Sequence, residues 1–174
     1  MSRLTPPVSE DDHRSGPDDA PVTLVEYGDF ECPHCGAAYP IVEGVRRRMG
    51  ARLRFVYRYF PLTEMHPHAM HAAEAAEAAG AQGRFWQMHG MLFEHQDALE
   101  DADLVRYAKA IDLDGKRFTS ELASETHVER VREHIRSGIR SGVNGTPTFF
   151  INGIRYDGSW EASNLLAALE AAAA

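Results

Sequence analysis

The chain has only two cysteines among its 174 residues, and it has no apolar run long enough to cross a membrane. Zinc held by cysteines alone is therefore excluded, because a structural zinc ion needs four ligands. The net charge of −8 disfavours binding to nucleic acid or to anionic membranes, which requires basic surface. With 44% hydrophobic and 25% charged residues, the composition predicts one globular domain with a substantial core.

The first 21 residues lack the apolar core that a secretory signal peptide needs. Taken as it stands, the sequence therefore predicts a cytoplasmic protein. If a signal was removed from a longer precursor, the compartment would be periplasmic or extracellular. Two cysteines in a CxxC suit either compartment, because a catalytic disulfide exists transiently even in a reducing cytosol.

Both cysteines lie in one motif, Cys32-Pro33-His34-Cys35, between a strand-like run at 22–27 and a helical pattern at 34–49. Strand, CxxC and helix in this order are typical of a dithiol–disulfide redox centre. Unpaired N–H groups and the helix dipole stabilise a thiolate at a helix start, and the thiolate is the form that attacks a disulfide. Cys32 is therefore the candidate nucleophile, expected to be exposed, and Cys35 is the more buried resolving thiol.

Two charged neighbours of Cys32 act in opposite directions. His34 is a candidate for stabilising the Cys32 thiolate, although it could also be a simple exposed histidine at the helix start. Glu31 precedes Cys32, and a neighbouring carboxylate raises the pKa of a thiol. The sequence therefore leaves open whether the pair oxidises or reduces its substrates.

The chain resembles the DsbA-like thiol–disulfide oxidoreductases of the thioredoxin superfamily. The CPHC motif at 32–35 is typical of that family, and two further features match. Glu26, six residues before Cys32, stands where the family often has a buried acid. The run Gly-Thr-Pro-Thr-Phe-Phe-Ile-Asn-Gly at 145–153 is similar to the family's cis-proline strand and hairpin turn. The resemblance spans about 20–169.

For Thr146 and Pro147, the resemblance implies a cis peptide bond and a loop that lies against the CxxC. It also implies that the backbone of Thr146 binds substrate. The alternative from the residues alone is a proline that opens an ordinary strand. We therefore expect the disulfide centre and Pro147 to be neighbours.

For Glu26, the resemblance implies a partly buried acid beneath the CxxC that relays protons for Cys35. The alternative is a surface glutamate on an edge strand, paired with Arg54 or Arg58. The sequence does not identify the basic partner.

The apolar periodicity predicts the order β-α-β, a helical block, then β-β-α, which is a thioredoxin fold with an inserted helical subdomain, as the resemblance implies. Residues 1–19 read as a flexible N-terminal arm, and 20–174 as the thioredoxin-like domain with the insertion at about 64–142. Asp101 and Asp114 are candidate helix caps. Strands are expected at about 22–27, 53–60, 147–151 and 154–156, and helices at about 34–49, 68–79, 126–141 and 160–171, with three shorter ones beginning near 85, 101 and 114.

Nine histidines provide the main alternative to an enzyme. His66, His68 and His71 form a cluster, and the last two share a helix face by spacing. Together with the CxxC they could hold a metal ion, so a redox-sensing or metal-binding module without turnover is a second hypothesis. Otherwise they are surface or helix-start residues.

The leading hypothesis is a thiol–disulfide oxidoreductase that exchanges the Cys32–Cys35 dithiol or disulfide with protein thiols or disulfides through a mixed disulfide. The chemistry requires no metal or organic cofactor. We expect a monomer with protein substrates and an unidentified redox partner. The native substrate and the direction of electron flow are left open.

Overall fold

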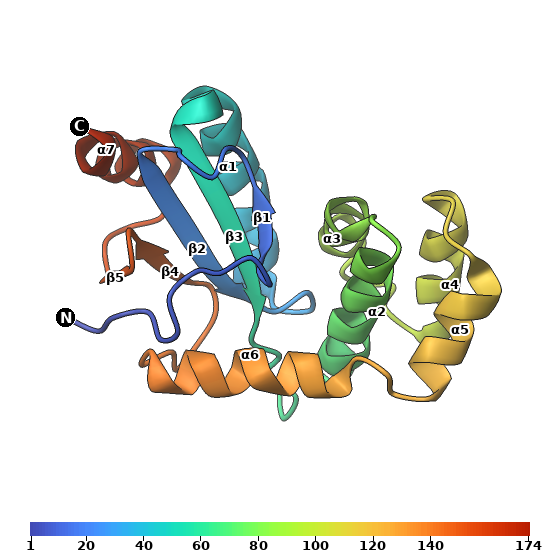
Figure 1. Cartoon of the computed structure of the whole chain (residues 1–174). Helices are drawn as coiled ribbons and strands as arrows, with labels where there is room; N and C mark the ends of the chain where they lie inside the picture. The colour runs from blue at the N-terminus through green and yellow to red at the C-terminus, as the bar shows by residue number, and fades with distance from the viewer.

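A five-stranded mixed sheet forms the centre of the computed structural model, which describes all 174 residues (Figure 1). Its strands lie in the order β1-β3-β2-β4-β5. The strands are β1 (His13–Ser15), β2 (Val22–Gly28), β3 (Leu53–Tyr59), β4 (Thr148–Ile151) and β5 (Ile154–Tyr156). The helices are α1 (Pro33–Met49), a short 3₁₀ turn η1 (Gly50–Arg52), α2 (Ala69–Ala81), α3 (Phe85–Glu94), α4 (Asp101–Ala110), α5 (Gly115–Ala123), α6 (Val128–Arg140) and α7 (Ala162–Ala173).

The two central strands are buried on both faces, which explains why apolar and aromatic residues predominate in both sequences. β2 pairs with β3 in parallel, from Val22 opposite Leu53 to Gly28 opposite Tyr59. β4 pairs with the other edge of β2 in antiparallel orientation. The predicted β-α-β unit and the thioredoxin fold with a helical insertion are confirmed.

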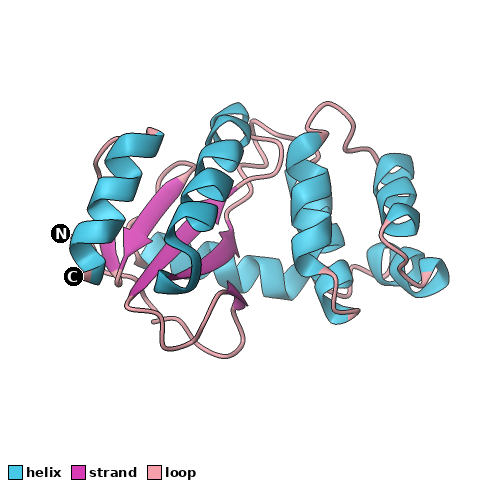
Figure 2. Cartoon of the chain, turned by 90° about the horizontal axis from the view of Figure 1, so that it is seen from above, coloured by secondary structure: helices cyan, strands magenta, loops and turns pink.

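Helices α1 and α7 cover one face of the sheet, and the block α2–α5 stands beside it (Figures 1 and 2). Helix α6 leads from this block back to the sheet and packs Ile135 against the opposite face. Tyr59 fixes this helix, because its backbone N–H donates to His134 Nδ1 at 3.1 Å. No helix is both long and apolar enough to span a bilayer.

Local signals set most boundaries in the helical insertion. Asp114 caps α5 as predicted, since its Oδ1 accepts the N–H of Arg117 at 3.0 Å. The predicted Asp101 cap of α4 is wrong. Glu100 is the cap and forms a reciprocal capping box with Asp103, so Asp101 is the first helical residue.

The hairpin between β4 and β5 turns at Asn152 and Gly153, as predicted. Both residues have positive φ, 48° and 79°, which the two central positions of a type I′ turn require. The turn pairs β4 with β5, whereas the pairing of β4 with β2 brings the loop before β4 to the end of the sheet where α1 begins.

The segment 1–19, expected to be a flexible arm, is packed along the sheet in this structure. Its strand β1 pairs with β3 in antiparallel orientation. The buried Arg58 of β3 donates to both carboxylate oxygens of Asp12, at 2.8 and 2.9 Å, and to the carbonyls of Pro6 and Pro7. The composition of the arm did not predict this packing, because the arm is polar and the residue that holds it, Arg58, lies in β3.

Candidate active site

Cys32 is the N-cap residue of α1, and Pro33 occupies the first helical position. Proline is well tolerated there because its missing N–H would have no helical partner. Cys35 is fully buried, as predicted, and both thiols are free. Cys32 is only 4% exposed, so the expectation of an exposed nucleophile is wrong. The loop at Thr146 lies over its sulfur, which donates to the Thr146 carbonyl at 3.6 Å.

The two thiols have opposite acidities. The hydrogen bond from the Cys35 thiol lowers the pKa of Cys32 to about 5 despite burial, and the backbone N–H groups of Cys35 and His34 contribute in the same direction. Burial raises the pKa of Cys35 well above its usual value, and the hydrogen bond to Cys32 and the charge of Glu26 raise it further. This asymmetry supports Cys32 as the nucleophile and Cys35 as the resolving thiol.

The peptide bond between Thr146 and Pro147 is cis, as predicted. Its loop lies against the CxxC, because the Thr146 carbonyl accepts the Cys32 thiol proton. The Thr148 hydroxyl donates to the Gly145 carbonyl at 2.7 Å and ties the two ends of the loop together. The Thr146 hydroxyl is buried without a hydrogen-bond partner. A proline that opens a strand away from the cysteines is therefore excluded.

Glu26 lies on the α1 face of β2, two residues from the core residue Leu24 and on the same side of the strand. It is 2% exposed. Burial raises the pKa of Glu26 to about 8, with the charge of Glu43 acting in the same direction and that of Arg46 opposing it. The acid is thus poised to exchange a proton near neutral pH.

Neither arginine considered as a partner of Glu26 pairs with it. Arg58 binds Asp12, and Arg54 donates to the Thr23 hydroxyl at 3.1 Å. Since Arg54 and Arg58 alternate with Tyr57 along β3, they lie on the face opposite Glu26.

Tyr57 is a buried neighbour of Glu26 that the sequence did not reveal. It stands directly opposite Glu26 in the β2–β3 register, and its hydroxyl is buried without a partner. Burial and the charges of Glu26 and Cys35 raise its pKa well above the usual value. Gly28 makes room for this side chain, because a Cβ there would lie 2.6 Å from the Tyr57 hydroxyl.

His34 is exposed at the second position of α1. Its backbone N–H contributes to the acidity of Cys32. Stabilisation of the Cys32 thiolate by the imidazole of His34 stays a prediction.

The two carboxylates that precede the CxxC are both bound to other groups. Glu31 accepts the backbone N–H of His68 at 2.7 Å and its Nδ1–H at 2.8 Å. The buried Asp29 contacts His66 Nδ1 at 2.7 Å. His71 pairs with Asp101 at a different place. The three histidines considered as metal ligands are therefore divided among three carboxylates.

The structure brings together no group of three or more His, Cys, Asp or Glu side chains that could hold a metal ion. The CxxC plus histidine cluster considered in the second hypothesis is therefore not assembled in this arrangement.

Gln96 is a second residue that the sequence did not reveal. It follows α3, and its Nε2 donates to the carbonyls of Phe30 and Cys32 at 2.9 and 2.8 Å. Gly36 allows this approach, because a Cβ there would overlap Gln96 Oε1. The helical insertion thus contacts the backbone on both sides of Glu31.

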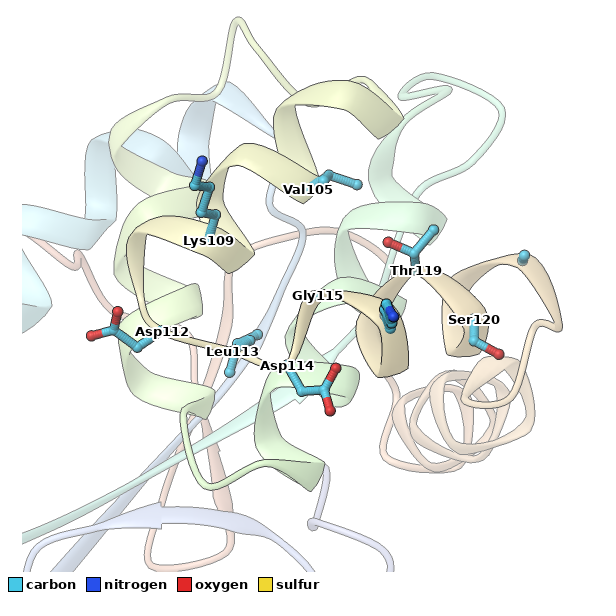
Figure 3. A pocket seen from close by; sticks show the side chains of 10 residues that line it. Val105, Lys109, Asp112, Leu113, Asp114, Gly115, Thr119 and Ser120 are labelled. Atoms are coloured by element: carbon cyan, nitrogen blue, oxygen red, sulfur yellow. The ribbon is translucent and has the colours of Figure 1, made fainter.

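A wide pocket of about 1160 Å³ lies between α4 and α5, away from the cysteines (Figure 3). Its lining includes Val105, Leu113, Lys109 and Asp112, and contains no cysteine, histidine or aromatic residue. It is therefore not part of the redox site.

Comparison with solved structures supports the fold. BdbD from Bacillus subtilis has a TM-score of 0.82 at 23% identity, over 92% of this chain and 91% of that one. A thioredoxin-like oxidoreductase from Silicibacter pomeroyi has a TM-score of 0.82 at 26% identity, over 94% and 93%. Wolbachia pipientis α-DsbA1 has a TM-score of 0.81 at 18% identity, over 95% and 92%.

Sequence comparison adds relatives of a different name. The Na⁺/H⁺ antiporter NhaA 1 of Salinispora arenicola is 50% identical over 97% of this chain, which corresponds to 26% of that protein. NhaA 1 of a Mycobacterium species is 44% identical over 98% of this chain and 28% of its own length. The chain thus spans about a quarter of the curated relatives that it matches.

The model of the thioredoxin family matches residues 8–171, which is nearly the whole chain. Together with the CPHC helix start, the cis-proline loop and the superpositions, this match shows that the chain belongs to the thioredoxin family and has the DsbA-like fold.

Proposed function

We propose that this chain is a thiol–disulfide oxidoreductase that acts on protein thiols or disulfides. The observation that carries the proposal is the pair of thiols with opposite acidity at the start of α1, beneath the Thr146–Pro147 loop. An acidic Cys32 is thiolate at neutral pH, and a protonated, buried Cys35 waits to resolve the intermediate.

In the reducing direction, the Cys32 thiolate attacks one sulfur of a substrate disulfide. The substrate S–S bond breaks, its leaving sulfur takes a proton, and a mixed disulfide forms. Cys35 then loses its proton and attacks the Cys32 sulfur, which releases the second substrate thiol and leaves the enzyme disulfide. Two electrons pass from enzyme to substrate, and the reverse sequence oxidises a substrate dithiol.

Three residues assist this exchange in our proposal. Glu26, with a pKa of about 8, accepts the proton that Cys35 must lose. The backbone of Thr146 binds the substrate chain beside Cys32, where its carbonyl already meets the sulfur. His34, exposed at the second position of α1, stabilises the thiolate through its backbone N–H.

The acidity of Cys32 indicates whether the chain oxidises or reduces its substrates. A stabilised thiolate stabilises the reduced protein, and that makes its disulfide a stronger oxidant. We therefore infer that the chain oxidises substrate dithiols, which fits a monomer working in an oxidising compartment with a separate partner that reoxidises it.

A second candidate function rests on the antiporter relatives, whose matching quarter is up to half identical to this chain. We propose that the unit can serve as a redox-active part of a sodium–proton antiporter. Membrane vesicles carrying such an antiporter would be assayed for Na⁺/H⁺ exchange with this chain oxidised or reduced. Equal exchange rates in both states would contradict this role.

The decisive experiment for the oxidoreductase traps the intermediate. Cys35→Ser should accumulate a mixed disulfide with a peptide that contains a disulfide bond, whereas Cys32→Ser should not. Limiting iodoacetamide at pH 6 should label Cys32 first in the reduced protein, because its pKa is the lower one. Preferential labelling of Cys35 would overturn the assignment, and the equilibrium with glutathione would give the reduction potential and hence the direction.

A further inference from the structure

The loop that precedes Cys32 is clamped to the segment that follows β3. Asp29 is fully buried, and its Oδ1 accepts the N–H of Glu31 at 2.8 Å. Its Oδ2 accepts the N–H of Leu62 at 2.9 Å and contacts His66 Nδ1 at 2.7 Å. A carboxylate can only accept, so His66 Nδ1 carries the donated proton.

His66 lies in a strongly negative environment, with a side chain only 13% exposed. Burial alone lowers its pKa, but the hydrogen bond and charge of Asp29 raise it above the usual value. The charges of Cys32 and Glu31 raise it further, and Glu31 is itself bound to His68. His66 is therefore a cation at the pH where Cys32 ionises.

We propose that His66 is a positioning residue for the redox centre, whose imidazolium, held in place by Asp29, stabilises the Cys32 thiolate and makes the Cys32–Cys35 disulfide more oxidising. This inference rests on the proposed oxidoreductase function. It assigns a part of the thiolate's stabilisation to a histidine outside the CxxC, contributed by the segment that leads into the helical insertion.

The electrostatic coupling between Cys32 and His66 is reciprocal. A thiolate at Cys32 that favours the protonated form of His66 must itself be favoured by that protonated form, by the same free energy. The folded pKa of His66 is raised, so this stabilisation is present at acidic pH and is lost as pH rises through that pKa. The reduction potential should therefore fall with pH more steeply in that window than the cysteines alone require.

Three variants separate charge from geometry. His66→Asn keeps an N–H donor near the Nδ1 position but removes the charge, and His66→Ala removes both. His71→Asn is the matched control, because His71 Nδ1 also contacts a carboxylate, Asp101, at 2.7 Å and also has a raised pKa. The groups that raise the pKa of His71 do not include Cys32.

The first measurement is the ultraviolet titration of the Cys32 thiolate in each reduced protein, together with the equilibrium against glutathione. Both His66 variants should raise the pKa of Cys32 by about half a unit and shift the equilibrium about threefold toward the enzyme disulfide. His71→Asn should change neither. If His66→Asn behaves as His71→Asn does, the inference is overturned.

The second measurement needs no variant. NMR titration of wild-type imidazoles should give a higher pKa for His66 in the reduced protein than in the oxidised one, with no such difference for His71. An equal His66 pKa in both redox states would refute the coupling even if His66→Ala failed to fold. Wild-type protein that does not exchange with glutathione would instead refute the proposed function, while the titration would still decide the role of His66.

Discussion

At the scale of single residues, burial raises the pKa of both acids of the site, yet their pKa values are shifted in opposite directions. Cys32 is acidic because hydrogen bonds outweigh its burial, whereas Glu26 has no comparable partner and its pKa rises. A raised folded pKa means that stability is fully present below the unfolded value of 4.5 and is lost as pH rises through about 8. Glu26 therefore reduces stability at neutral pH.

Glu26→Gln should thus stabilise the oxidised protein by about 3 kcal/mol at pH 7, because the neutral amide avoids the cost of keeping an ionisable acid in the core. The gain should vanish below about pH 4, where the acid is protonated in both states. Urea titrations between pH 4 and 8 measure this. Glu10→Gln, at an exposed glutamate, is the control, and parallel pH profiles for Glu26→Gln and wild type would contradict the raised pKa.

At the scale of elements, the helical insertion holds the active-site loop through Gln96 as well as through His66. The Gln96 amide donates to two carbonyls of the loop, and Gly36 of α1 leaves the space for it. A glycine inside a helix ordinarily costs about 1 kcal/mol relative to alanine. Its presence here follows from the approach of a side chain 60 residues away in sequence.

Gly36→Ala should therefore be destabilising in the wild-type protein, since Gln96 must leave its carbonyls, with a loss of about 1–3 kcal/mol. In a Gln96→Ala background the same change should be stabilising by about 1 kcal/mol, because only helix propensity remains. A double-mutant cycle by urea unfolding measures the reversal. Additive effects would show that the two residues do not interact; Gln87→Ala is the control.

The N-terminal arm gives a second prediction at this scale. Asp12→Ala should destabilise the protein by about 3 kcal/mol, because it leaves the buried Arg58 guanidinium without its carboxylate. Asp11→Ala, next to it but exposed, should change stability little. Limited proteolysis should cut the arm faster in Asp12→Ala alone; equal rates would mean that the pair does not hold the arm.

At the scale of the whole molecule, the redox state and the global stability are linked through Cys32. Its folded pKa of about 5 lies below the ordinary value of 9.0. The resulting stability is present above the unfolded pKa and is lost as pH falls through the folded one. Only the reduced protein has this thiol, so the difference between the two redox states reports Cys32 together with Glu26 and His66, whose pKa values respond to its charge.

The reduced form should therefore gain about 3 kcal/mol relative to the oxidised form between pH 4 and 7, and at pH 7 it should be at least as stable. The disulfide offsets little of this gain, because it closes a very short loop. Parallel denaturant titrations of both redox states measure the gap, and replacing His34 should narrow it. An oxidised form that is clearly the more stable at pH 7 would favour a reductase.

The sequence by itself determined the order of the elements, the CPHC helix start, the Asp114 cap and the Asn152-Gly153 turn. Helix periodicity, turn chemistry and capping are local, and the family resemblance implied the two segments of the site and the cis bond before Pro147. These signals lie within a few neighbouring residues, so they can be recognised without the fold.

Only the tertiary structure decided which side chains meet at the redox centre. Gln96, His66 and Tyr57 reach the site across 31 to 66 positions of sequence, through strand register and the docking of the insertion. The packing of the arm depends in the same way on one buried arginine of β3. Such contacts join single side chains from distant elements and leave no periodic pattern, because they follow from how whole elements pack against one another.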